Sequence, residues 1–288
     1  MKRYVKLLAL GTLLALLLSA CNTVSKQADA NLEVQITNGQ RDNGEHPYVG
    51  ALLFTQNGVG YYSCTGTLLS PTVMLTAGHC TEEGGNVNDV TYVRFTEEAL
   101  AGRSDYSSTQ AWLDAEWILA KRVVPHPLYD DYSSFPDTYD IGLVILSEPV
   151  YVATYGELAP LGYFGNASTS ELKHTLFEAV GYGAQYDYPP QSNKPLPPDD
   201  FARYKTVNSF INTGSAVTGA QNVKFTSNPG HGQGGTCFGD SGGPHFVNNT
   251  NTIVAVTSYG VAANCKGNEY NFRADIPLTY DFVTPYLR

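Results

Sequence analysis

The feature that most constrains the fold is a series of short apolar runs separated by turn residues. Most of these runs lack a helical period. The 28 glycines and 16 prolines of the chain supply the turns that many short strands need. The sequence therefore predicts an all-β fold, a sandwich or a pair of barrels, with a short C-terminal helix in Leu278–Leu287. Strands are predicted at Tyr48–Phe54, Ser63–Leu69, Val73–Thr76, Val90–Phe95, Ile118–Val124, Ile141–Leu146, Leu176–Gly181, Lys205–Ile211, Val247–Thr257 and Tyr270–Ile276.

Composition restricts the kind of protein and its organisation. The chain has 17 Lys and Arg residues and 27 Asp and Glu residues, which gives a net charge of −10. A chain this acidic lacks the basic surface of a nucleic-acid binder. Hydrophobic residues make up 42% of the chain, which is enough for a sizeable core. Five prolines in Ala184–Asp200 predict a long exposed loop within one domain.

The first residues resemble an export signal. A basic start precedes the apolar run Leu7–Leu18, which is too short to span a membrane comfortably and suits a signal peptide. Leu18–Cys21 resembles a bacterial lipobox, which implies that Cys21 carries lipid and becomes the mature N-terminus. The alternatives are an ordinary secretory cleavage just before this cysteine and an uncleaved anchor. We expect a lipoprotein signal at 1–21 and a polar tether or propeptide at 22–35.

Four cysteines remain once Cys21 is set aside. An even number in an exported chain predicts two disulfides, and three connectivities are open on spacing alone. The clustered spacing of a zinc site is missing, so we expect neither a metal nor a cofactor. The four residues are Cys64, Cys80, Cys237 and Cys265.

A serine surrounded by glycines is the strongest chemical signal. It is Ser241, in the segment Gly239–Pro244, which spells GDSGGP. Glycines remove side chains that would block a substrate carbonyl. They also let the backbone N–H groups of Gly239 and Ser241 point at one spot, where they would stabilise an oxyanion. The alternative is a flexible turn without chemical function.

A serine nucleophile needs a base and a group that orients the base. His79 follows a predicted strand directly, between a glycine and Cys80. Asp140 stands immediately before the apolar run Ile141–Leu146. If the carboxylate packs behind the imidazole, it accepts a hydrogen bond and fixes the tautomer that can take a proton from serine.

Taken in the order His79, Asp140 and Ser241, the segments LTAGHC, YDIGLVIL and GDSGGP resemble the trypsin-like, chymotrypsin-fold serine peptidases. The resemblance covers 36–288. It implies two six-stranded antiparallel β-barrels with the active site in the cleft between them. It also implies a monomeric endopeptidase that acts on polypeptides through an acyl-enzyme.

The resemblance also implies how the cysteines pair. Cys64 would bond to Cys80 around the histidine loop, and Cys237 to Cys265 beside the substrate pocket. This pairing uses all four remaining cysteines, so the resemblance agrees with the even count.

Specificity depends on a second set of residues that the resemblance implies. Gly235 stands where an Asp would select Lys or Arg, and Gly260 leaves the pocket wall open. An uncharged P1 side chain, the one before the scissile bond, is therefore expected. The alternative is a preference for basic residues restored by Glu269, near a second wall position. The implied substrate-binding residues are Gly235, Thr236, Ser258, Tyr259 and Gly260.

Activation by cleavage is a further implication. Ile36 begins a segment, Ile-Thr-Asn-Gly, that resembles the N-terminus of the activated family members, although Gln35 precedes it. A cut there would let the new α-amino group pair with Asp240. The alternative is an enzyme that is competent without the cut.

Two functions from different classes therefore compete. The first is a secreted or lipid-anchored serine endopeptidase of the bacterial cell envelope, attached to the membrane through Cys21. The second is a catalytically inactive, protease-like surface lipoprotein that binds a partner. The complete set of His79, Asp140 and Ser241 favours the enzyme.

Overall fold

The computed structural model of the chain describes residues 36, 39–56, 59–81, 89–184, 201–228, 233–262, 265 and 267–287. The predicted signal peptide, Cys21 and the tether lie outside the described residues, as does the predicted proline-rich loop apart from Ala184. No helix of the described part is both long and apolar enough to cross a membrane.

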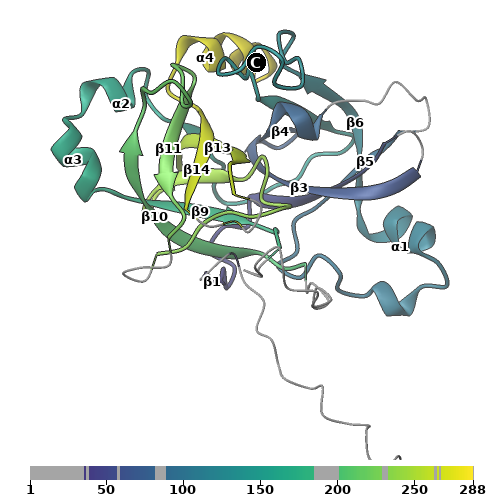
Figure 1. The fold of residues 1–288 in the computed structure, drawn as a ribbon. Coiled ribbons are helices and arrows are strands. Elements are labelled where there is room, and N and C mark those ends of the chain that lie inside the picture. Colours follow the sequence, from purple (N-terminus) through teal and green to yellow (C-terminus); the bar gives the residue numbers. More distant parts are fainter. Residues whose placement is uncertain are drawn as a thin grey trace, which may run out of the picture. The chain divides into compact units, whose positions relative to one another are not determined.

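Six strands of the first half close into a barrel (Figure 1). Their order around the barrel is β2, β3, β4, β7, β6 and β5, and each pairs antiparallel with its neighbours. Leu52, Val93 and Leu143 are fully buried in its interior, as their apolar runs predict. The strands are β2 (Val49–Gln56), β3 (Val59–Ser70), β4 (Val73–Thr76), β5 (Thr91–Arg94), β6 (Ile118–Pro125) and β7 (Gly142–Leu146).

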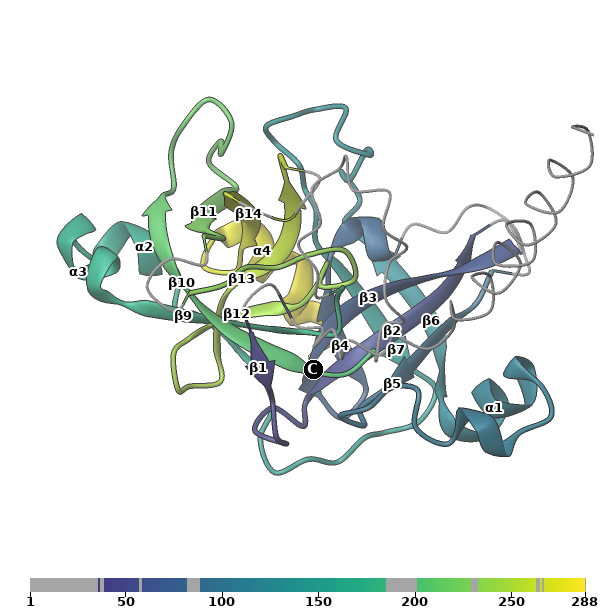
Figure 2. The same cartoon turned by 60° about the horizontal axis from the view of Figure 1, so that its bottom comes forward.

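The second half closes a second antiparallel barrel, because β9 pairs with both β10 and β12. Two short strands extend its sheet: β1 runs along β10, as Figure 2 shows, and β8 pairs parallel with β13. The prediction of two six-stranded barrels is confirmed. The strands are β1 (Gln40–Arg41), β8 (Glu157–Leu158), β9 (Leu176–Gly181), β10 (Tyr204–Asn212), β11 (Asn222–Thr226), β12 (Pro244–Val247), β13 (Thr252–Gly260) and β14 (Asn268–Arg273).

Helices in the described residues are short. The predicted C-terminal helix is present as α4 (Pro277–Val283), continued by the 3₁₀ turn η4 (Thr284–Tyr286). The sequence pattern does not predict α1 (Thr109–Glu116), which begins at an N-cap where the side chain of Ser108 accepts from the Ala111 N–H. The others are α2 (Tyr163–Asn166), α3 (Thr169–His174), η1 (Gly78–Cys80) and η2 (Arg103–Asp105).

One strand prediction was wrong in a way that has a local cause. The run Val247–Thr257 holds two strands, because β12 ends at Val247 and β13 begins at Thr252. Between them, Asn249 has a φ of 59°, a left-handed conformation that asparagine tolerates better than most residues. By contrast, β4 and β9 coincide with their predicted ranges.

A buried arginine joins the two barrels. Arg203, which is 2% exposed and lies just before β10, donates from Nη1 to the carbonyl oxygen of Val49 in β2 at 3.0 Å. The same nitrogen donates to the carbonyl oxygen of Phe95 at 3.1 Å and to the Tyr182 hydroxyl at 2.9 Å. Its Nε donates to Asp42 at 2.8 Å. Asp42 thus compensates the charge of Arg203. The arginine in turn links the segment before β2 to the second barrel.

His46 lies in the same buried network. Its Nδ1 is 2.5 Å from Asp42 Oδ1 and its Nε2 is 3.2 Å from Glu178 Oε1. Burial alone would lower the pKa of His46, but the hydrogen bonds and charges of these two carboxylates outweigh it and raise the pKa. The hydrogen bond from His46 and the charge of Arg203 lower the pKa of Asp42 to about 2, against the effect of its burial.

We therefore expect stability that depends on the charge of His46. Its raised pKa means that this contribution is full below the ordinary value of 6.5 and is lost as the pH rises through the folded-state pKa. His46→Gln should lower the free energy of unfolding by about 1–3 kcal/mol at pH 6, because both carboxylates keep another cation. It should also flatten the decline in stability towards alkaline pH, measured by urea unfolding.

His174→Gln is the matched control, because this histidine is exposed and its Nδ1 contacts only the carbonyl oxygen of Ser170 among the interactions described for it. The control should keep the wild-type pH dependence. If His46→Gln also kept it, the buried histidine would not be the source.

Candidate active site

Backbone contacts from the first barrel hold the Ser241 segment. The Thr65 N–H, in β3, donates to the Ser241 carbonyl oxygen at 2.8 Å, and the Thr65 hydroxyl donates to the Gly239 carbonyl oxygen at 2.9 Å. Gly242 has a φ of 81°, and a Cβ there would lie 2.0 Å from Thr76 Oγ1. Glycine is therefore required at this position, as the motif indicates.

The peptide before Gly239 is oriented by a neighbouring strand end. The Phe238 carbonyl oxygen accepts from the Ala184 N–H at 2.6 Å. Because the N–H and C=O of a trans peptide point in opposite directions, the Gly239 N–H points away from Ala184. Asp240 stabilises this turn, since its carboxylate accepts from the N–H groups of Gly183 at 2.7 Å and Cys237 at 2.9 Å. The role of the Gly239 N–H in holding an oxyanion stays a prediction.

His79 and Asp140 are brought together at the end of β4. His79 lies on η1, directly after that strand, and its backbone N–H donates to Asp140 Oδ1 at 2.9 Å. Its ring Nδ1 is 3.0 Å from each carboxylate oxygen. A proton on Nδ1 leaves Nε2 unprotonated in the neutral ring, and this nitrogen can then accept a proton from a nucleophile.

Asp140 is fully buried at the start of β7. Burial alone would raise its pKa, but the charge of His79 and hydrogen bonds from His79 and Ser258 outweigh burial and lower the pKa. The Ser258 hydroxyl donates to Oδ2 at 2.5 Å, so a residue predicted to bind substrate also supports the carboxylate. The Tyr132 hydroxyl donates to the same oxygen at 2.8 Å. No sequence motif indicates this tyrosine.

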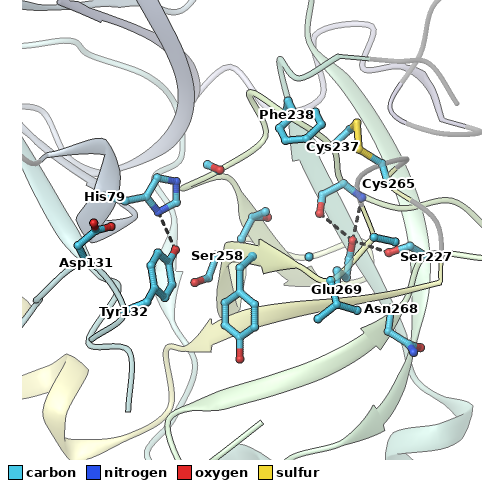
Figure 3. Close-up of a pocket in the computed structure, with 17 residues that line it drawn as sticks. His79, Asp131, Tyr132, Ser227, Cys237, Phe238, Ser258, Cys265, Asn268 and Glu269 are labelled. Atoms are coloured by element: carbon cyan, nitrogen blue, oxygen red, sulfur yellow. Dashed lines mark hydrogen bonds between the residues drawn. A yellow bond between two sulfur atoms is a disulfide. The ribbon is translucent and has the colours of Figure 1, made fainter. Parts of the chain in front are cut away.

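His79 and Ser241 line one cavity of about 630 Å³ (Figure 3). Of the predicted substrate-binding residues, Thr236, Ser258, Tyr259 and Gly260 also line it. Gly235 does not line it: a Cβ there would lie 2.3 Å from the Ser227 Cβ, so its backbone packs against Ser227. The predicted residues are thus gathered around one space, with Gly235 behind its wall.

Glu269 occupies the wall of this cavity, opposite Gly260 in the register of β13 and β14. Its Oε2 accepts from the Thr236 N–H at 2.8 Å, the Thr236 hydroxyl at 2.7 Å and the Ser227 hydroxyl at 3.0 Å. Its Oε1 accepts from the Asn208 side-chain amide. Each carboxylate oxygen is therefore occupied by donors from the protein.

The donors around Glu269 are uncharged. Burial raises the pKa of Glu269, and the hydrogen bonds from Thr236 and Ser227 only partly oppose it. His245 Nε2 lies 3.6 Å from Oε1, but burial lowers the pKa of His245 to about 3, so this ring is neutral at ordinary pH. Among the residues that the structure describes, no charged cation therefore compensates this carboxyl group of the cavity wall.

Both disulfides implied by the resemblance are present. Cys64 bonds to Cys80 beside His79, and Cys237 bonds to Cys265 in the cavity wall. Cys64, His79 and Cys80 are grouped as metal ligands would be, but the two sulfurs are bonded to each other and are not thiolates. This group therefore does not form a metal site.

Ile36 is fully buried and packs with Ala202 and Tyr204, next to β10. The Asp240 carboxylate accepts from the N–H groups of Gly183 and Cys237. The activation pair of Ile36 and Asp240 stays a prediction.

Comparison with known proteins agrees with this geometry. The family model for trypsin matches residues 36–283. Serine protease 1 of Drosophila melanogaster is 27% identical over 258 residues, which cover 89% of this chain and 84% of the relative. Brachyurin of Leptuca pugilator is 29% identical over 230 residues, or 78% of this chain and 85% of the relative.

A solved structure shares the fold. The structure titled HL collagenase superimposes with a TM-score of 0.63 at 20% identity, over 88% of this chain and 98% of that one. At this identity the likeness concerns the fold alone. The matched family model spans both barrels and every motif of the site. The chain belongs to the trypsin family of serine proteases, and its activity is that of a serine endopeptidase.

Proposed function

We propose that the chain hydrolyses peptide bonds with Ser241 as nucleophile, His79 as general base and Asp140 as the group that orients the base. One observation carries the assignment: the buried carboxylate of Asp140 bonds to His79 through both oxygens, while His79 and Ser241 line the same cavity. No other group is needed to generate the nucleophile, because the imidazole accepts its proton.

The reaction then runs in two halves. Ser241 Oγ attacks the scissile carbonyl carbon as its proton passes to His79 Nε2. The N–H groups of Gly239 and Ser241 hold the oxyanion, each worth about 3 kcal/mol. His79 next gives the proton to the leaving amine, which leaves an acyl-enzyme, and water releases the acid by the same steps.

Loss of the nucleophile tests the assignment. Wild-type protein cut to begin at Ile36 should react with a fluorophosphonate probe, and Ser241→Ala cut in the same way should not react. The substitution should also lower kcat for peptide hydrolysis by about 10⁴-fold or more.

Ser104→Ala, at an exposed serine, is the control and should react like wild type. Reaction of the Ser241→Ala protein would refute the assignment. If neither wild type nor a form cut to begin at Ile36 reacted, the chain would be an inactive binding protein.

We also propose that the cavity accepts uncharged P1 side chains in preference to basic ones. The only acidic residues among the described lining are Asp131 and Glu269. Donors of the wall already occupy both oxygens of Glu269, and burial favours its uncharged form. A basic side chain would have to displace these donors before it could form an ion pair.

Peptide substrates that differ only at P1 test this preference. The wild type should cleave after Phe or Leu at least about tenfold more efficiently, in kcat/KM, than after Lys or Arg at pH 7. Glu269→Gln should leave cleavage after Phe within about threefold of wild type and remove the residual cleavage after Lys. Asp131→Asn, the other acid of the lining, is the matched control and should keep that residual cleavage.

A wild-type preference for Lys or Arg that Glu269→Gln abolishes would reverse the assignment. In that case Glu269 would be the ionised partner of a basic P1 side chain.

We propose a lipid anchor at Cys21 and activation by a cut between Gln35 and Ile36. The basic start, the apolar run and the lipobox-like segment support export and lipidation. Two disulfides support an oxidising compartment outside the cytoplasm. The burial of Ile36 beside the second barrel, where its side chain packs with Ala202 and Tyr204, supports the cut.

N-terminal mass spectrometry tests both parts. The precursor should begin at Cys21 and carry lipid, and the form that reacts with the fluorophosphonate should begin at Ile36 without lipid. Cys21→Ser should lose the lipid, whereas Ser25→Ala, in the same tether, should keep it. A reactive form that begins at Cys21 would contradict the activation step.

A further inference from the structure

Tyr132 contacts both residues that prepare the nucleophile. Its hydroxyl donates to Asp140 Oδ2 at 2.8 Å and lies 3.2 Å from His79 Nδ1. Figure 3 shows Tyr132 directly below His79, with its hydroxyl directed at the imidazole. The hydroxyl has one proton, and the shorter contact to an anion takes it. The Nδ1 proton of His79 remains directed at Asp140.

The loop that carries Tyr132 holds a conformation that most residues avoid. Asp131 and Tyr132 have φ values of 53° and 62°, and Tyr139, just before Asp140, has a φ of 47°. Left-handed conformations at residues with side chains are unfavourable and cluster where the surrounding structure imposes them. The strained residues lie in the loop between β6 and β7, and one of them, Tyr132, contacts the Asp140 carboxylate.

Contacts with the second barrel fix this loop. The Gln221 side-chain oxygen accepts from the Tyr139 N–H at 2.9 Å, and the Asn222 side-chain amide donates to the Pro136 carbonyl oxygen at 3.3 Å. The Tyr132 ring packs edge-on against Tyr259 of β13. The hydroxyl is therefore held in place from both barrels and does not swing freely.

The Tyr132 hydroxyl donates to a carboxylate oxygen that already has two other hydrogen-bond partners. Asp140 Oδ2 also accepts from the Ser258 hydroxyl and faces His79 Nδ1. A donor that approaches a carboxylate withdraws part of its charge, and a carboxylate with less free charge stabilises an adjacent imidazolium less. Burial and the charge of Asp140 raise the pKa of Tyr132, so the hydroxyl keeps its proton throughout the working pH range.

We propose that Tyr132 is a positioning residue of the site: its hydroxyl holds Asp140 against His79 and moderates the charge that the imidazole meets. This inference rests on the proposed roles of His79 and Asp140. Tyr132 acts through Asp140 and does not touch the reacting atoms. Without the hydroxyl, the carboxylate is less well oriented and more strongly charged towards His79.

The other ionisable groups near the pair are unchanged by a substitution at Tyr132. Among the described residues they are Asp131, which lines the same cavity, Tyr129, whose ring contacts Tyr132, and Tyr259 of β13. The charge of Asp131 acts on His79 with and without the Tyr132 hydroxyl. A difference between wild type and a variant that lacks only the hydroxyl therefore reports its hydrogen bond.

Tyr132→Phe, made in the full chain and measured in the form that begins at Ile36, tests the proposal, because it keeps the ring and removes the hydroxyl. The acid limb of the kcat/KM profile, which reports protonation of the base, should move to higher pH by about half a unit. The plateau value of kcat should fall about three- to tenfold while KM stays unchanged. The downfield ¹H resonance of the His79 Nδ1 proton should shift, and its titration should move in the same direction.

Tyr106→Phe is the matched control, since this hydroxyl donates to a carboxylate oxygen of Glu116 at 2.7 Å on the surface near α1. It should leave the profile and the resonance unchanged. A Tyr132→Phe protein with wild-type kcat, profile and resonance would overturn the proposal, as would a change confined to KM. Absence of hydrolysis by both the uncut wild type and the form that begins at Ile36 would refute the proposed triad, whereas the resonance would still test the contact between Tyr132 and Asp140.

Discussion

The buried carboxylate of Asp140 is the interaction on which the active site depends. A charge without solvent costs several kcal/mol unless donors surround it, and these donors come from three separate elements. His79 reaches it from η1, Tyr132 from the loop between β6 and β7, and Ser258 from β13 of the other barrel. The charge is satisfied only after both barrels have closed, so catalytic geometry is a consequence of correct folding.

The same principle operates in a second buried network between the barrels. Arg203, Asp42 and His46 are buried charges with no role in the reaction, and their partners come from β2, β9 and the segment before β10. Exchanging one of them would remove an ion pair from the others, which makes the contact between the barrels specific. Buried charge therefore determines how the two barrels meet at both places.

Local patterns predicted an all-β fold, an even number of bonded cysteines and the triad residues, whereas the two six-stranded barrels and the cysteine pairing were predicted only from the resemblance to the trypsin-like peptidases. His79, Asp140 and Ser241 lie in short segments whose chemistry requires particular neighbours, so each was identifiable without tertiary contacts. Tyr132 has no such neighbours: its role arises from a strained loop that meets the second barrel. The sequence could not predict the environment of Glu269 either, since its hydrogen-bond donors come from segments far apart in sequence.

The pKa values of two buried carboxyl groups in this site are shifted in opposite directions, and this difference suits the two groups to different roles. Asp140 lies against His79, whose charge and hydrogen bonds overcome burial and keep the group ionised. Glu269 is surrounded by neutral donors, and the nearby His245 is itself too deeply buried to protonate at ordinary pH. A carboxyl group beside a cation can stabilise positive charge that develops on the base. A carboxyl group saturated by neutral donors instead shapes the wall of the pocket. In the proposed reaction, the charge of one neighbour, His79, therefore distinguishes the carboxyl group that acts in catalysis, Asp140, from the one that acts in recognition, Glu269.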